Sequence, residues 1–220
     1  MSSRLSTVLT LVVLGALCLT ASASPLCTDS TATFNIGGGV TNDPVSCLGL
    51  TFNNWQAIAK IGSPSGSIAV AGYDTGSTVF LDFSLVLLSN QDINVYFTVT
   101  GPLLGIDLFN GGSGPTLIIE KACSVGFGEV PGNNRPASRC TGTLLADINA
   151  MSNGSSNFLF TGGQSNLTYI FKDIGTQSGG AMSDFTESFH TSVPEPTTFV
   201  LLGAGLLVIG AIARRRRATK

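Results

Sequence analysis

Two neighbouring stretches of this 220-residue chain alternate between apolar and polar side chains, and this period of two restricts the fold more than any other feature. Residues 78–88 place five apolar side chains on one face, and residues 92–100 place four. Successive side chains of a strand point to opposite faces, so each stretch predicts a strand with one buried face. The three residues between them fit a hairpin loop, which predicts a long antiparallel hairpin at the centre of a sheet.

Shorter stretches of the same kind are separated by turns rich in Gly, Asn, Ser and Pro. They lie at residues 31–36, 103–109, 117–121, 124–128, 142–147, 157–161, 167–173 and 185–191. Residues 55–61 fit either a short helix or a strand, and residues 129–139 predict an exposed loop. Many short strands without a sustained helical period predict an all-β fold, an antiparallel β-sandwich of jelly-roll type.

The beginning of the chain has the layout of a secretory signal peptide. Arg4 precedes an apolar run at residues 5–19, and Ala21, Ser22 and Ala23 follow as a small-residue cleavage pattern. Such an order predicts that residues 1–23 are removed during export. The mature chain then starts at Ser24 or close to it.

The end of the chain predicts a short membrane helix. Residues 197–213 contain nine strongly apolar side chains and no charge, which contribute about −3 to −5 kcal/mol to insertion. Seventeen residues span roughly 25 Å, the lower limit for crossing a bilayer. A basic cluster follows, which predicts a cytoplasmic end and places the preceding domain, residues 24–192, outside. The cluster consists of Arg214, Arg215, Arg216 and Arg217.

A proline-containing motif precedes this apolar segment. It consists of Val193, Pro194, Glu195 and Pro196. The two prolines hold the residues before them away from helical dihedral angles, which predicts an extended segment that a processing enzyme could bind. With the glycine-bearing apolar run and the arginines, residues 193–217 resemble the PEP-CTERM sorting signal of Gram-negative surface proteins. The resemblance implies an exosortase as partner, and a chain held in the membrane only until it is cut.

The charge and cysteine content of residues 24–192 narrow the possible partners and cofactors. This region has five basic and twelve acidic residues, a formal net charge of −7, which disfavours nucleic acid and anionic lipid. Four cysteines in an exported chain predict two disulfides, and three pairings are possible. We favour the sequential pairing, Cys27 with Cys47 and Cys123 with Cys140, because it closes two local loops. A zinc site would have to consume these cysteines.

Several residues are candidates for a catalytic or ligand-binding role. His190 is the only histidine, so a Ser-His-Asp site would need it, but no motif surrounds it. The acidic residues are scattered, which disfavours the paired carboxylates of a glycoside hydrolase. Trp55 and Tyr96 could stack on sugar rings, or lie in the core. No cofactor is expected, although aspartates near strand ends or turns could bind Ca²⁺; they are Asp74, Asp82, Asp92, Asp107 and Asp147.

Together these patterns favour a non-enzymatic surface or matrix protein that an exosortase sorts, with a structural or adhesive role linked to exopolysaccharide or biofilm. The alternatives are a secreted hydrolase and a carbohydrate- or calcium-binding module. A cleft that holds His190 or two facing carboxylates would favour the hydrolase. A flat aromatic strip would favour sugar binding.

Overall fold

The computed structural model describes residue 27 and residues 30–75, 77–130, 135–160 and 165–191. These residues form strands and no helix, which confirms the predicted all-β class. Every pair of neighbouring strands is antiparallel. The strands are β1 Thr31–Asn35, β2 Val45–Cys47, β3 Leu50–Ile61, β4 Ser67–Thr75, β5 Thr78–Leu87, β6 Asp92–Asn110, β7 Thr116–Cys123, β8 Phe127–Val130, β9 Arg135–Cys140, β10 Leu144–Met151, β11 Ser155–Leu159, β12 Ser165–Thr176 and β13 Met182–Thr191.

The long strand β6 belongs to both layers of the fold. Its first half pairs with β3 and β12, and its second half pairs with β13 and β11. The change of strand partners falls at Gly101, whose φ of 126° is in the region that favours glycine. A Cβ atom at this position would collide with the Gly49 carbonyl. Residues 103–109, predicted as a separate strand, therefore continue β6 after a bend.

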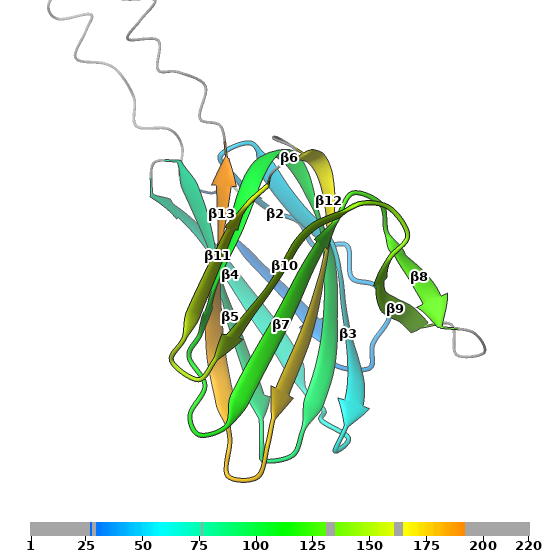
Figure 1. Cartoon of the computed structure of the whole chain (residues 1–220), viewed down its shortest axis with the longest axis vertical. Helices are drawn as coiled ribbons and strands as arrows, with labels where there is room; N and C mark the ends of the chain where they lie inside the picture. Colours follow the sequence, from blue (N-terminus) through cyan, green and yellow to red (C-terminus); the bar gives the residue numbers. More distant parts are fainter. Residues whose placement is uncertain (1–26, 28–29, 76, 131–134, 161–164, 192–220) are drawn as a thin grey trace, which may run out of the picture.

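The two layers pack face to face as a sandwich (Figure 1). The first layer has the order β1, β4, β5, β13, second half of β6, β11. The second has the order β2, β3, first half of β6, β12, β7, β10. In Figure 1, β7 and β10 cross in front of β4 and β5.

The predicted hairpin between β5 and β6 is wrong, although both of its strands exist. β13 lies between β5 and the second half of β6, and pairs with both. The connection at residues 88–91 instead carries the chain from the first layer to the second. Both apolar faces still reach the same core, because two facing layers can bury them as well as one sheet can.

Aromatic side chains fill the space between the layers. Trp55 is fully buried and its ring lies 5.6 Å from that of Phe34 and 4.9 Å from that of Phe97. Its indole N–H donates to the Asp43 carbonyl at 2.8 Å, so the one polar atom of the ring is satisfied. Residues 55–61, for which helix and strand were both possible, are therefore part of β3.

A small hairpin covers part of the outer face of the second layer. β8 and β9 form a separate two-stranded sheet over residues 127–140, which includes residues 129–139, where an exposed loop was predicted. Phe127 at the start of β8 lies 5.8 Å from the ring of Tyr96 and 5.7 Å from that of Phe171. These contacts bury Tyr96 to 6% exposure, so it is a packing residue.

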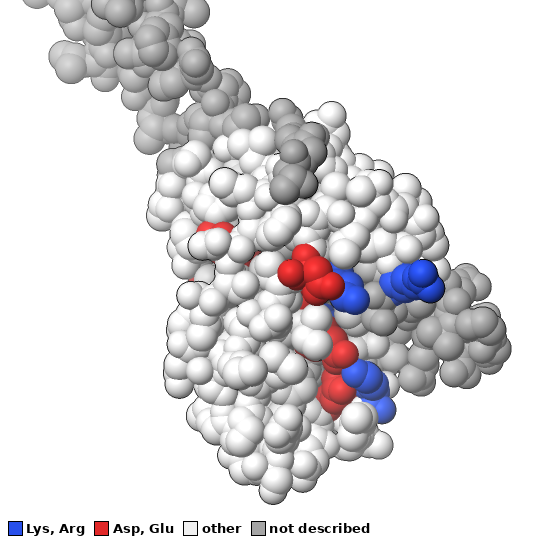
Figure 2. All heavy atoms as spheres, viewed as in Figure 1, with Lys and Arg blue, Asp and Glu red and all other residues white. Residues whose placement is uncertain are grey.

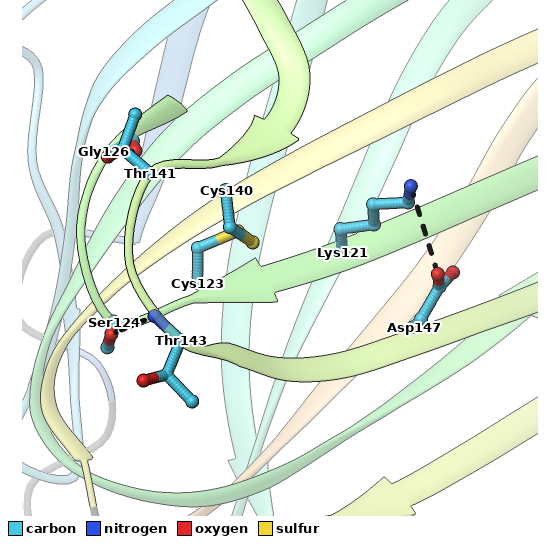
Figure 3. The surroundings of a disulfide bond; sticks show 8 residues. All are labelled: Lys121, Cys123, Ser124, Gly126, Cys140, Thr141, Thr143 and Asp147. Atoms are coloured by element: carbon cyan, nitrogen blue, oxygen red, sulfur yellow. Dashed lines mark hydrogen bonds and ion pairs between the residues drawn. A yellow bond between two sulfur atoms is a disulfide. The ribbon is translucent and has the colours of Figure 1, made fainter. Parts of the chain in front are cut away.

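Two disulfides join Cys27 to Cys47 and Cys123 to Cys140, which confirms the sequential pairing. The second one ties the β8–β9 hairpin to the end of β7 (Figure 3). Beside it, the Thr143 N–H donates to the Ser124 hydroxyl at 2.9 Å.

We expect the double variant Cys123→Ser, Cys140→Ser to lose about 3 kcal/mol of unfolding free energy, since the bond closes a loop of 17 residues. Urea unfolding under oxidising conditions measures this loss. Reduction of the unchanged protein should remove more, because it also opens Cys27–Cys47. Equal midpoints for the variant and the unchanged protein would contradict the prediction.

Within the described ranges, no helix has the length and apolar character to cross a bilayer. The predicted signal peptide, the motif at residues 193–196, the apolar run 197–213 and the arginines at 214–217 lie outside the described residues.

Candidate functional site

A polar cavity of about 360 Å³ lies on the outer face of the second layer, beside the connection between β5 and β6. Strand pairing builds it: Asp92 at the start of β6 lies opposite Ile61 of β3 and Gly175 of β12. Its lining combines amide, hydroxyl and charged groups with three apolar side chains. The lining residues are Lys60, Ile61, Asn90, Gln91, Asp92, Leu117, Ile119, Asp173, Gly175, Thr176 and Gln177.

Lys60 joins two carboxyl groups in this cavity. Its ammonium lies 2.7 Å from Asp173 and 3.0 Å from Asp92. Burial and the neighbouring Asp173 raise the pKa of Asp92 to about 6, against the opposing effect of Lys60. Burial lowers the pKa of Lys60, but the two carboxylates outweigh it and raise that pKa overall. Neither aspartate was expected to pair with the other, because their strands are far apart in the sequence.

The Lys60 ammonium separates the two carboxyl groups of this cavity. A two-carboxylate hydrolase places the scissile bond between its acids, but here the Lys60 ammonium occupies that position. The volume is within the range of small-molecule sites, while most of the lining is polar. Figure 2 shows few charged side chains on this face, and acidic and basic groups lie next to each other.

We expect the unfolding free energy to fall as the pH rises from about 4 to about 7, because folded Asp92 holds its proton to a higher pH than the unfolded chain does. The raised pKa of Asp92 contributes about 1–3 kcal/mol to the unfolding free energy. This contribution is fully present below pH 4 and is lost above about pH 6. In the Asp92→Asn variant, the unfolding free energy measured by urea unfolding should no longer show this contribution to its decline with pH. Asp147→Asn, at the exposed pair with Lys121, is the control and should not. Parallel pH curves for the unchanged protein and Asp92→Asn would contradict the assignment.

His190 lies on the outer face of the first layer, away from the cavity. Its Nε2 is 2.6 Å from Asp107, which also accepts a hydrogen bond from Ser188 at 3.1 Å. Thr78 Oγ1 is 3.4 Å from His190 Nδ1, a long contact for a nucleophile and its base. Asp107 was predicted as a possible Ca²⁺ ligand, and it instead orients the His190 ring.

The other proposed ligands are also dispersed. Asp82 accepts a hydrogen bond from Thr186 at 2.7 Å, and Asp147 lies 3.8 Å from Lys121. In the described part of the chain, no three His, Cys, Asp or Glu side chains come together as a metal site.

The aromatic residues suggested for sugar stacking are unsuitable for it, because Trp55 and Tyr96 are buried. An exposed aromatic pair lies elsewhere: the rings of Tyr73 and Phe80 stack at 5.1 Å on the outer face of the first layer. Tyr73 is 42% exposed.

A second ionisable cluster lies inside the sandwich. The Lys172 ammonium is 2.6 Å from Glu120 and 2.6 Å from Glu187, and all three side chains have no exposed surface. Burial and the adjacent Glu120 raise the pKa of Glu187 well above its usual range, although Lys172 opposes this. The sequence pattern predicted solvated carboxylates, so this cluster was missed.

Comparison with known proteins identifies the end of the chain. Residues 192–217 match the family model of the PEP-CTERM protein-sorting motif, which confirms the resemblance seen in the sequence. The motif implies export, membrane anchoring before processing, and cleavage by an exosortase. No curated protein matches the chain.

Two solved structures share a general likeness with the sandwich. The carbohydrate-binding module TmCBM61, in complex with β-1,4-galactotriose, is 11% identical with a TM-score of 0.29, over 62% of this chain and 84% of its own. The enzymatically active domain of bacteriophage CBA120 tailspike protein 4 is 12% identical with a TM-score of 0.26, over 62% of this chain and 18% of its own. Likeness at this level carries no argument about function.

Proposed function

We propose that this chain is a non-enzymatic surface or matrix protein whose polar cavity binds a saccharide group of an extracellular polysaccharide. The observation that carries the proposal is the Lys60 ammonium held between Asp92 and Asp173 inside the cavity. Sugar hydroxyls need both donors and acceptors at fixed positions, and the amide of Gln177 adds one of each. The sorting motif supports delivery to the cell surface, where such polymers lie.

The proposed absence of catalysis rests on the position of the candidate groups. His190 has a strong partner in Asp107 but only a distant hydroxyl on its other nitrogen. The cavity carboxyls are bridged by Lys60. Neither arrangement places a nucleophile and a free base together.

Binding of the purified protein to exopolysaccharide from the producing strain tests the proposal, measured by calorimetry or affinity electrophoresis. Lys60→Met should weaken binding at least about tenfold, because it removes a charged donor worth about 1.5–3 kcal/mol. Lys121→Met is the matched control, since it removes another lysine–aspartate pair on the same layer. His190→Ala should also leave binding unchanged.

Equal binding by Lys60→Met and the control, or no binding to any polysaccharide fraction, would overturn the assignment of the cavity. Release of shortened sugars that stops in His190→Ala would restore the hydrolase alternative.

A further inference from the structure

The cluster of Lys172, Glu120 and Glu187 joins the two layers inside the core, and the cavity proposal does not use it. We propose that the side chains of Lys172 and Glu187 condense to an amide, so that the mature fold contains a covalent cross-link between β12 and β13. This site differs from both disulfides, which lie elsewhere in the fold.

The strands hold the reacting atoms together. Lys172 and Glu120 are direct partners across β12 and β7 in the second layer, while Glu187 reaches them from β13 in the first. Lys172 Nζ lies 2.6 Å from an oxygen of each carboxyl group. An amine at such a distance from a carboxyl oxygen lies about 3–3.8 Å from the carboxyl carbon, a range that overlaps the 3–3.5 Å of a near-attack arrangement.

The two carboxyl groups differ in their contacts. Glu120 accepts an aligned hydrogen bond from Lys172. Both oxygens of Glu187 lack an aligned hydrogen-bond partner among the described residues, although Nζ is equally close. The Lys172 amine therefore lies as close to Glu187 as to Glu120, while its aligned hydrogen bond goes to Glu120.

Charge balance assigns the chemical roles. One ammonium can neutralise one carboxylate, so a dry core favours a proton on the second carboxyl group. The aligned hydrogen bond from Lys172 goes to Glu120, and burial and Glu120 raise the pKa of Glu187, so we assign the proton of the pair to Glu187. A neutral carboxylic acid is the better electrophile, whereas a carboxylate repels a nucleophile. Glu120 is thus the base and Glu187 the acceptor of the new bond.

The reaction needs no outside reagent. The Lys172 ammonium gives a proton to Glu120, and the free amine attacks Cδ of Glu187. The Glu187 C–OH bond then breaks, as Glu120 passes a proton to the leaving hydroxyl and takes one from the nitrogen. One N–C bond forms, one C–O bond breaks, one water leaves, and Glu120 ends protonated. No atom is oxidised or reduced.

The surroundings favour the product. The Lys172 ammonium lies 5.4–6.0 Å from the ring centres of Phe83, Phe97 and Phe185, and its side chain has no exposed surface. A core of this kind excludes the water that would hydrolyse the amide. Condensation also replaces a buried ion pair by neutral groups, which removes a large desolvation cost.

Mass spectrometry of the full chain, exported with its own signal, tests the cross-link after reduction and tryptic digestion. The chain should be lighter than its sequence by one water, and trypsin should not cut after Lys172. The peptide that begins at Cys140 should then continue past Glu187 and carry the loss. Lys60 is the internal control: it also faces two carboxyl groups, but is 43% exposed, and trypsin should cut after it.

Two variants separate the roles. Glu187→Leu keeps the Lys172–Glu120 pair and should show the full mass, with cutting at Lys172 restored. Glu120→Gln keeps the shape but removes the base, and should leave a large unreacted fraction. Full mass in the folded, unchanged protein would overturn the proposal. So would a water loss that joins Lys172 to the peptide ending at Lys121, because that bond would use Glu120.

Discussion

Compared with protein in which the Lys172–Glu187 amide has not formed, Lys172→Met is expected to lower the unfolding free energy by about 3–5 kcal/mol at neutral pH, as is typical when one partner of a buried ion pair is removed. The change leaves Glu120 and Glu187 together in a core without a cation. Burial and mutual repulsion then favour the protonated form of both acids. The folded state would hold protons that the unfolded chain releases, so stability should be greatest below about pH 4 and decline as the pH rises.

The triple variant Lys172→Met, Glu120→Leu, Glu187→Leu is the matched comparison. Apolar side chains of similar volume often replace a buried ion cluster at no cost in stability. We therefore expect the triple variant to exceed Lys172→Met by about 3–5 kcal/mol at pH 7, and to lose the steep pH dependence. Neither variant can form the proposed amide, so the comparison is independent of it. Equal stability of the two at pH 7 would show that the buried acids cost little.

The strands could be predicted from the sequence because their alternation is local. The inward faces of β5 and β6 were identified from the period of two, and both are buried. Their pairing could not be predicted, because a short polar connection fits a hairpin and a crossing between layers equally well. The order of strands depends on β13, which arrives about a hundred residues later and fits between them.

The same alternation contained an overlooked signal for the buried cluster. Lys172 lies on the same strand face as Ile170 and Ile174, and Glu187 lies on the same strand face as Phe185 and Phe189. Their strands could not turn these charges outward without exposing the apolar neighbours. A charge on the apolar face of a predicted strand therefore indicates a buried partner on another strand, here Glu120.

The cavity could not be predicted in this way. Lys60 and Asp173 are 113 residues apart and are on outward faces, where charged side chains are common. Only the pairing of β3, β6 and β12 brings them together. The sorting signal is the opposite case: its parts are contiguous, so the sequence was sufficient to recognise it.

Changing Pro194, Glu195 and Pro196 to alanine is expected to abolish cleavage of the tail and to leave membrane insertion intact. Insertion depends on the apolar run at 197–213 and on the basic cluster, not on the motif. β13 ends at Thr191, so five residues separate the folded domain from that run. An extended chain of this length spans at most about 17 Å, so an uncut domain must stay next to the membrane.

We expect the arginines to set the depth at which the motif is presented. A run of about 25 Å leaves no spare length, so the basic cluster and the motif must both lie at the membrane surfaces. Neutral replacements of the four arginines should therefore weaken the stop and the orientation, and leave full-length chain outside the inner membrane. C-terminal mass spectrometry of surface protein from cells with an active exosortase measures each outcome. Unchanged chains that still end in Lys220 would mean that the tail is only an anchor, whereas chains cut near residues 194–196 confirm that the motif is used.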